Sequence, residues 1–114
     1  MHKNKFISTF DSLKVQSTSH YIGKKYVFFR EEELQSPLTQ IAIGTLIAEE
    51  VVLFHIHESM EEVFYILSGN GTFYIGEEQY NVNKNCCIRV PSGHSHSIKA
   101  DSDLQFYYFG VATK

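Results

Sequence analysis

The sequence predicts an all-β protein, built as a sandwich or a barrel of short strands. From Gln40 onward, short apolar segments alternate with turn signals at regular spacing. No segment shows the 3.6-residue apolar period of a long helix. The nine Phe and seven Tyr side chains fit a pleated, half-buried surface better than a helix. A length of 114 residues suits one domain.

The expected elements follow one another along the chain. Residues 1–39 are expected to form one strand, Tyr26 to Phe29, and an arm that packs on the barrel or on a partner subunit. Residues 40–114 are expected to form the barrel, with a hairpin turn at Ser68-Gly69-Asn70-Gly71. The barrel strands are expected at residues 41–48, 51–57, 62–67, 72–75, 79–82, 86–90, 96–100 and 104–111.

The apolar residues of these strands predict a hydrophobic core. This core is large enough that folding should not depend on a bound metal, unlike the folding of a zinc finger. Its expected members are Ile41, Ile43, Leu46, Val52, Phe54, Phe64, Ile66, Phe73, Ile75, Ile88, Val90, Ile98 and Phe106.

Composition excludes several classes of function. The net charge is −3 and the basic residues are scattered, whereas a nucleic-acid binder needs a clustered basic face. No apolar run approaches the ~18 residues of a membrane span, and the first residues do not read as a signal peptide. Cys86 and Cys87 are adjacent, so a disulfide between them would be strained. A reducing, cytoplasmic location is therefore predicted.

Four residues form the main candidate site. If residues 51–57 are a strand, His55 and His57 share one face of it, because side chains alternate. Glu62 begins the next expected strand, and His96 follows the turn Pro91-Ser92-Gly93. Three imidazoles and one carboxylate are a donor set that suits a divalent first-row metal.

Neighbouring residues offer alternatives to this assignment. His94 also follows the turn, but it is expected to face away from the site or to lie at its rim. Glu61 should face away from Glu62, because adjacent side chains on a strand point to opposite faces. A barrel without a working site is the alternative to metal binding. Three tyrosines could offer a phenol to a ligand, although core packing is the commoner use of buried aromatics: Tyr74, Tyr107 and Tyr108.

The spacing of these residues resembles the two signature motifs of the cupin superfamily. The first family motif has His-x-His, three or four residues, Glu, six residues and Gly, which here falls on His55, His57, Glu62 and Gly69. The second has Pro-x-Gly, two residues and His, which ends here at His96. Each motif alone is a weak signal, but both together, in order and separated by hairpin-forming strands, are specific.

The resemblance covers residues 40–111 and implies a double-stranded β-helix, or jelly-roll, barrel. It further implies that His55, His57, Glu62 and His96 bind one divalent transition metal: Fe, Mn, Ni, Zn or Cu. It also implies a homodimer, because cupins commonly pair two barrels through N-terminal strands.

Three positions depart from the family pattern. The family has glycine where this chain has Glu49 and Asn85, and asparagine where it has Ala100. Asparagine tolerates a positive φ, so Asn85 should make the same turn. Glutamate does so less easily, and the turn around Glu49 and Glu50 is therefore expected to be reshaped. Ala100 loses a side-chain hydrogen bond but no ligand.

The expected function is that of a metalloenzyme acting on a small polar organic substrate. The superfamily includes dioxygenases, isomerases and decarboxylases, and a carbohydrate is among the substrates that the resemblance allows. The alternative is a non-catalytic module that binds or senses a sugar or another small molecule. No catalytic residue is assigned, and no charged residue besides the four is expected in phase with them inside the barrel.

Overall fold

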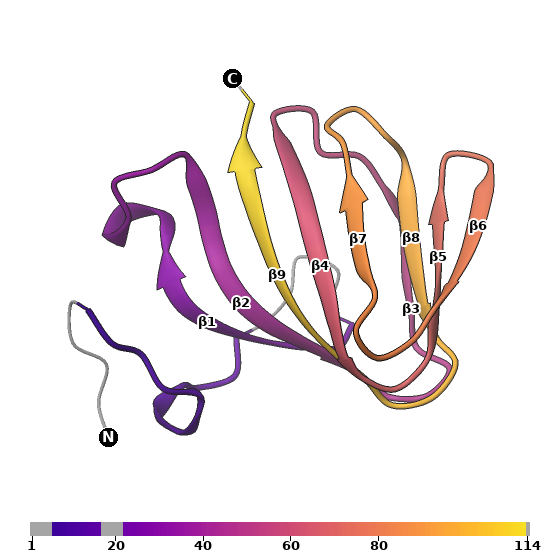
Figure 1. Cartoon of the computed structure of the whole chain (residues 1–114), viewed down its shortest axis with the longest axis horizontal. Coiled ribbons are helices and arrows are strands. Elements are labelled where there is room, and N and C mark those ends of the chain that lie inside the picture. Colours follow the sequence, from indigo (N-terminus) through magenta and orange to yellow (C-terminus); the bar gives the residue numbers. More distant parts are fainter. Residues whose placement is uncertain (1–5, 17–21, 114) are drawn as a thin grey trace.

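The computed structural model describes residues 6–16 and 22–113. Within them, nine strands form two antiparallel sheets, with strand orders β1-β2-β9-β4-β7 and β3-β8-β5-β6 (Figure 1). The elements are the short 3₁₀ helices Phe10–Ser12 and Glu31–Glu33, and the strands β1 Lys24–Arg30, β2 Leu38–Leu46, β3 Val51–His55, β4 Met60–Ser68, β5 Gly71–Ile75, β6 Glu78–Val82, β7 Cys87–Val90, β8 His96–Ala100 and β9 Leu104–Ala112. The all-β, jelly-roll prediction is confirmed.

The N-terminal strand belongs to the larger sheet. β1 pairs antiparallel with β2 and places Lys25 opposite Gly44 and Val27 opposite Ala42. The strand expected at residues 26–29 therefore exists but is longer, and it forms one edge of the five-stranded sheet (Figure 1). No helix among the described residues is long and apolar enough to cross a membrane.

The core lies between the sheets, as the alternation on β4 illustrates. Glu62, Phe64 and Ile66 occupy alternate positions and are all buried. The Phe64 ring meets Phe73 of the opposite sheet edge to face, with centroids 5.2 Å apart. Such contacts across the interior join the two sheets and hold the inward face of β4 in place.

One residue of the expected core lies outside it. The side chain of Phe54 is 55% exposed, whereas the other members are buried or half-buried. The cause is a bulge in β3: Val52 pairs with Ile98 and His55 with His96, so three steps along β3 match two along β8. The strand expected to run to His57 also ends earlier, at His55.

The turn at Glu49 keeps the backbone conformation that the family glycine would adopt. Glu49 has a φ of 76° and Asn85 a φ of 74°. The expectation for Asn85 is confirmed, and the expectation of a reshaped turn at Glu49 is wrong. Hydrogen bonds to β8 hold the turn: the Glu49 N–H donates to the Ala100 carbonyl (2.8 Å), and the Ala100 N–H donates to the Glu50 carbonyl (2.9 Å).

Candidate metal centre and its cavity

The four residues singled out by the motifs lie together in the fold. His55 ends β3, Glu62 lies near the start of β4, and His96 begins β8, while His57 follows β3 in a loop. The pairing of β3 with β8 puts His55 directly opposite His96, with ring centroids 4.1 Å apart. One nitrogen or oxygen atom from each of the four lies within 4.8 Å of the other three.

His96 defines the electrostatics of the centre. Its Nδ1 atom lies 3.0 Å from the His94 carbonyl oxygen, which can only accept a hydrogen bond. The proton must therefore be on Nδ1, and Nε2 carries the lone pair in the neutral ring. Nε2 is buried, lies 3.3 Å from Glu62 Oε1, and has no aligned hydrogen-bond partner among the described residues. With a neutral ring, the lone pair of His96 Nε2 therefore faces the negatively charged Glu62 Oε1.

A positive charge between these atoms would relieve that repulsion. Burial lowers the pKa of His96, but the adjacent Glu62 side chain and the His94 carbonyl outweigh burial and raise the pKa above its ordinary value. When no metal is bound, these contacts favour the protonated form of the His96 imidazole relative to an imidazole in water. A cation at the same place would satisfy both the imidazole and the carboxylate.

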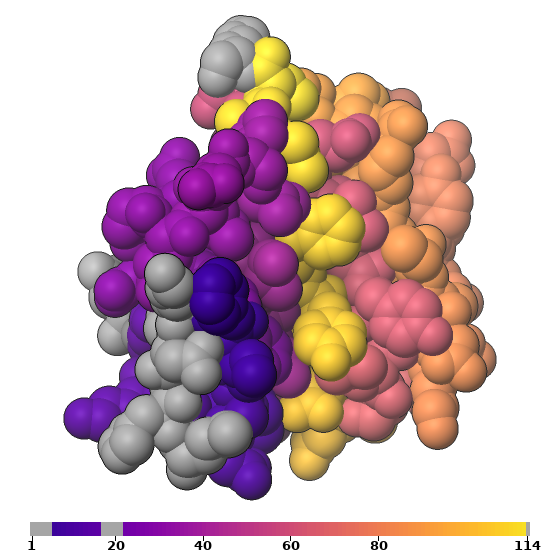
Figure 2. All heavy atoms as spheres, turned by 60° about the vertical axis from the view of Figure 1, so that its left-hand side comes forward, coloured from indigo at the N-terminus to yellow at the C-terminus, as the bar shows by residue number. Residues whose placement is uncertain are grey.

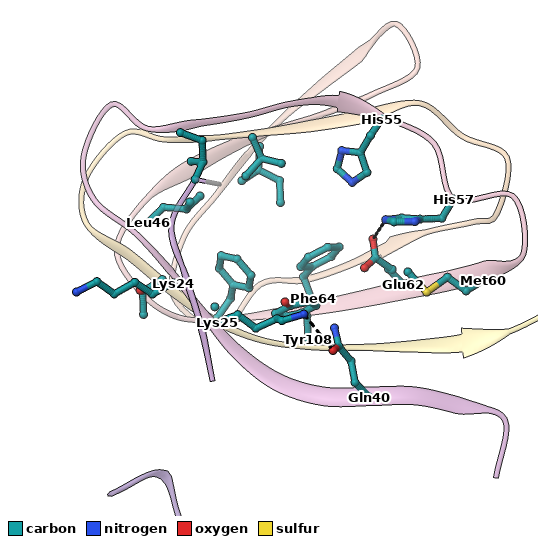
Figure 3. A pocket seen from close by; sticks show the side chains of 16 residues that line it. Lys24, Lys25, Gln40, Leu46, His55, His57, Met60, Glu62, Phe64 and Tyr108 are labelled. Carbon is teal, nitrogen blue, oxygen red and sulfur yellow. Dashed lines mark hydrogen bonds and ion pairs between the residues drawn. The ribbon is translucent and has the colours of Figure 1, made fainter. Parts of the chain in front are cut away.

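The other two histidines present compatible donors. His55 Nδ1 lies 2.9 Å from the Leu53 carbonyl oxygen, which fixes the same tautomer as in His96 and puts the lone pair on Nε2. His57 Nε2 lies 3.4 Å from Glu62 Oε1 (Figure 3). Three imidazoles whose orientation is set partly by backbone carbonyls, together with one buried carboxylate, fit a divalent transition metal.

The neighbouring candidates, His94 and Glu61, lie outside the centre. His94 precedes β8, so strand alternation accounts only for Glu61, which is adjacent to Glu62 on β4. His94 is exposed, and its Nδ1 atom lies 3.3 Å from the Ser92 carbonyl oxygen. The carboxylate of Glu61 instead forms an ion pair with Arg89 of β7, at 3.3 Å. Neither residue belongs to the group of four.

A cavity of about 260 Å³ opens beside the centre. His55, His57 and Glu62 line part of it, and residues of β1, β2 and β9 also contribute (Figure 3). The walls between them are mainly apolar, and they are formed by Ile22, Leu46, Val52, Met60, Phe64, Ile98 and Phe106. At the small end of the ~300–1,000 Å³ usual for ligand pockets, this volume suits a small metabolite.

Sequence reasoning missed two charged residues of this cavity. Lys24 and Lys25 contribute to its lining, so the expectation of no further charged residue inside the barrel is wrong. Lys25 and Val27 are two residues apart in a strand, so their side chains share one face. That this face is the inner one follows only from the pairing of β1 with β2.

Tyr108 is the tyrosine that reaches the cavity. Its ring stacks on Phe64 with centroids 5.6 Å apart and an interplanar angle of 12°. Burial and the charge of Glu62 raise its pKa, and a hydrogen bond with Gln40 only partly opposes them, so the phenol keeps its proton. The absent side chain of Gly44 makes room for this ring: a Cβ there would lie 3.2 Å from Tyr108 Cε1.

A comparison with known sequences finds one relative of undefined role. An uncharacterized protein of Methanocaldococcus jannaschii is 32% identical in an alignment 85 residues long, and the match covers 69% of this chain and 66% of that protein. The match thus spans slightly less than two thirds of the relative's own length.

Solved structures share the fold at low identity. A predicted oxalate decarboxylase of Thermotoga maritima is 21% identical, with a TM-score of 0.86 over 94% of this chain and 99% of the other. An RmlC-like cupin of Shewanella frigidimarina is 10% identical, with a TM-score of 0.81 over 100% and 96% of the two chains. KdgF from Halomonas sp. is 11% identical, with a TM-score of 0.77 over 94% and 92%.

The family assignment rests on sequence and fold together. The family model of the cupin domain matches residues 42–111, which include both motifs up to Ala100 and all four residues of the centre. The two-sheet architecture agrees with the cupin structures just described. The chain therefore belongs to the cupin superfamily.

Proposed function

We propose that this cupin is a metal-dependent enzyme that acts on a small anionic organic substrate. His55, His57, Glu62 and His96 would hold one divalent transition metal. The observation that carries the proposal is the contact between His96 Nε2 and Glu62 Oε1, which places a lone pair and a carboxylate 3.3 Å apart in a buried site.

A metal held by these residues would act as a Lewis acid and keep positions open for substrate. Three neutral imidazoles and one carboxylate leave the loaded centre with a net positive charge, which favours an anionic ligand. The protonated phenol of Tyr108 is available as a hydrogen-bond donor within the same cavity. The apolar walls limit water and so strengthen these interactions.

Three reaction types fit such a cavity: decarboxylation, isomerisation and dioxygenation. For an anionic substrate, the metal that His55, His57, Glu62 and His96 would hold would supply a positive centre for its anionic oxygen in each of the three. The fold neighbours include a predicted oxalate decarboxylase and the protein KdgF, whose likeness to this chain extends to the fold alone.

A non-catalytic binding module is the second candidate, and one observation favours it. Among the described residues that line the cavity, Glu62 is the only carboxylate, so no separate acidic side chain is available as a general base. A tyrosine or a lysine would have to move any proton.

Turnover by the metal-loaded protein tests the two candidates. Wild type and Tyr108→Phe should both bind metal and small carboxylic acids, sugar acids included, and product formation should fall in the variant. Binding of these acids without turnover in the wild type would favour the binding module. Failure of the wild type to take up iron, manganese, nickel, zinc or copper would contradict the proposal in both forms.

A further inference from the structure

Lys25 is a cation that lines the cavity, and no carboxylate of the described residues pairs with it. Its side chain is half-buried, and its Nζ atom lies 3.5 Å from Gln40 Oε1. In Figure 3 the Lys25 side chain extends along the cavity towards Gln40, whereas the end of Lys24 points away. Of the described residues, no Asp or Glu forms an ion pair with Lys25, although Arg30, Arg89 and Lys99 all have such partners.

The register of β1 and β2 explains why Lys25 reaches the interior. Lys25 lies opposite Gly44, whose missing side chain leaves space on the inner face for the Phe106 and Tyr108 rings. Lys24 is opposite Thr45 and is exposed. The two adjacent lysines therefore differ in environment, although they are identical in chemistry.

The charges of the cavity are unbalanced without a ligand. Glu62 is the only carboxylate in the described lining, and it already contacts His57 and His96. A half-buried ammonium group attracts an anion more strongly than it would in bulk water, because the surrounding dielectric constant is lower. A ligand that carried one anionic group to the metal centre and another to Lys25 would neutralise the positive charge at both places.

We infer that Lys25 and Gln40 form a subsite for a second anionic group, so that the substrate is a small dicarboxylate or a similar doubly anionic acid. This inference rests on the proposed function, since the first carboxylate is taken to bind at the metal centre. One carboxylate oxygen accepts a hydrogen bond from the Lys25 ammonium, and the Gln40 amide positions that ammonium.

The volume of the cavity limits the chain length of the proposed dicarboxylate substrate. At roughly 30 Å³ for each water-sized group, a cavity of about 260 Å³ has room for about nine non-hydrogen atoms. A dicarboxylate with a chain of about four or five carbon atoms matches this volume, and its methylene groups would contact the apolar walls.

Calorimetric titration of the metal-loaded protein with succinate, glutarate and butyrate tests the subsite. Butyrate has the chain length of succinate but a single carboxylate. The wild type should bind succinate or glutarate at least tenfold more tightly than butyrate, because the second carboxylate gains a charge-assisted hydrogen bond. Lys25→Met should abolish that preference while leaving butyrate binding within twofold of the wild type.

Lys24→Met is the matched control, because it removes the same charge from the adjacent position. It should retain the preference for dicarboxylates, and Lys25→Arg should retain most of it. Metal content and circular dichroism should be unchanged in all three variants, which separates a lost subsite from a lost fold.

Different outcomes overturn the subsite and the function on which it rests. A metal-loaded wild type that binds the diacids and butyrate equally, or an equal loss in Lys24→Met and Lys25→Met, would overturn the subsite alone. A wild type that takes up no metal would overturn the metal-dependent function itself.

Discussion

His96 Nε2 and Glu62 Oε1 face each other across 3.3 Å in the interior, and the His94 carbonyl holds the proton of the imidazole on the opposite nitrogen. The two residues come from neighbouring regions of different sheets, β8 and β4. A site that favours a cation therefore forms only when folding brings β4 and β8 together. The predictions below concern that place and the fold around it.

Metal content should depend on His96 and not on His94. His96→Ala removes a buried donor of the centre and should lower the metal content of the purified protein at least tenfold. His94→Ala removes an exposed ring outside the group of four and should leave the content unchanged. Inductively coupled plasma mass spectrometry on both variants makes the comparison, and equal loss in the two would contradict the ligand assignment.

Removal of the metal should leave the fold intact. The core between the sheets is continuous and includes large buried side chains such as Phe73, Ile66 and Leu104. Metal should then add stability only by mass action, about 2.7 kcal/mol at a hundredfold excess over Kd. Chelated protein should retain its β-sheet circular dichroism at room temperature, with a lower Tm. Loss of the β-sheet signal on chelation would show that the core alone is insufficient.

Glu49→Gly should stabilise the protein. A glutamate at a φ of 76° pays a steric cost that glycine avoids, and relief of about 1 kcal/mol would raise the Tm by about 4 °C. The variant loses only an exposed contact of 3.7 Å with Lys99. The control is Glu50→Gly, at a position without positive φ, which should destabilise. Thermal unfolding measures the Tm of both variants. A lower Tm for Glu49→Gly than for the wild type would contradict the strain at Glu49.

We also predict a homodimer through the outer face of the five-stranded sheet. This face carries aromatic side chains, including Tyr65, Tyr107 and Phe28, the last two with ring centroids 6.4 Å apart. Figure 2 shows aromatic rings of the C-terminal strand in the middle of the face, with the N-terminal region on one side and β4 on the other. Light scattering at micromolar concentration should give the mass of two chains.

A pair of variants with similar exposure tests this surface. Tyr107→Asp places a charge in the aromatic face, where Tyr107 is 43% exposed, and should produce monomers. Tyr80→Asp changes a 48% exposed tyrosine on β6 of the other sheet and should leave the dimer intact. A monomeric wild type would exclude the dimer, and dissociation by Tyr80→Asp alone would place the interface on the other sheet.

Much of the fold could be predicted because it depends on patterns within short segments, such as the alternation of apolar and polar side chains along a strand. Alternation along residues 62–66 predicts that Glu62, Phe64 and Ile66 share the inner face, and all three are buried. Phe54 was wrongly placed because a bulge shifts the alternation by one residue, and the bulge depends on the pairing of β3 with β8. Glu49 was misjudged for a related reason: hydrogen bonds to Ala100 hold a turn that glutamate alone would not favour.

The sequence by itself determined an all-β class of short strands, because apolar segments and turn signals are local patterns. The resemblance of its two motifs to the cupin superfamily then indicated the jelly-roll barrel and the four candidate ligands. Only the tertiary structure decided what the cavity presents to a ligand. Lys25 enters it because β1 pairs with β2 opposite Gly44, and Tyr108 lies there because β9 joins the same sheet. Such pairings join residues far apart in the chain, and no local pattern of charge or hydrophobicity specifies them.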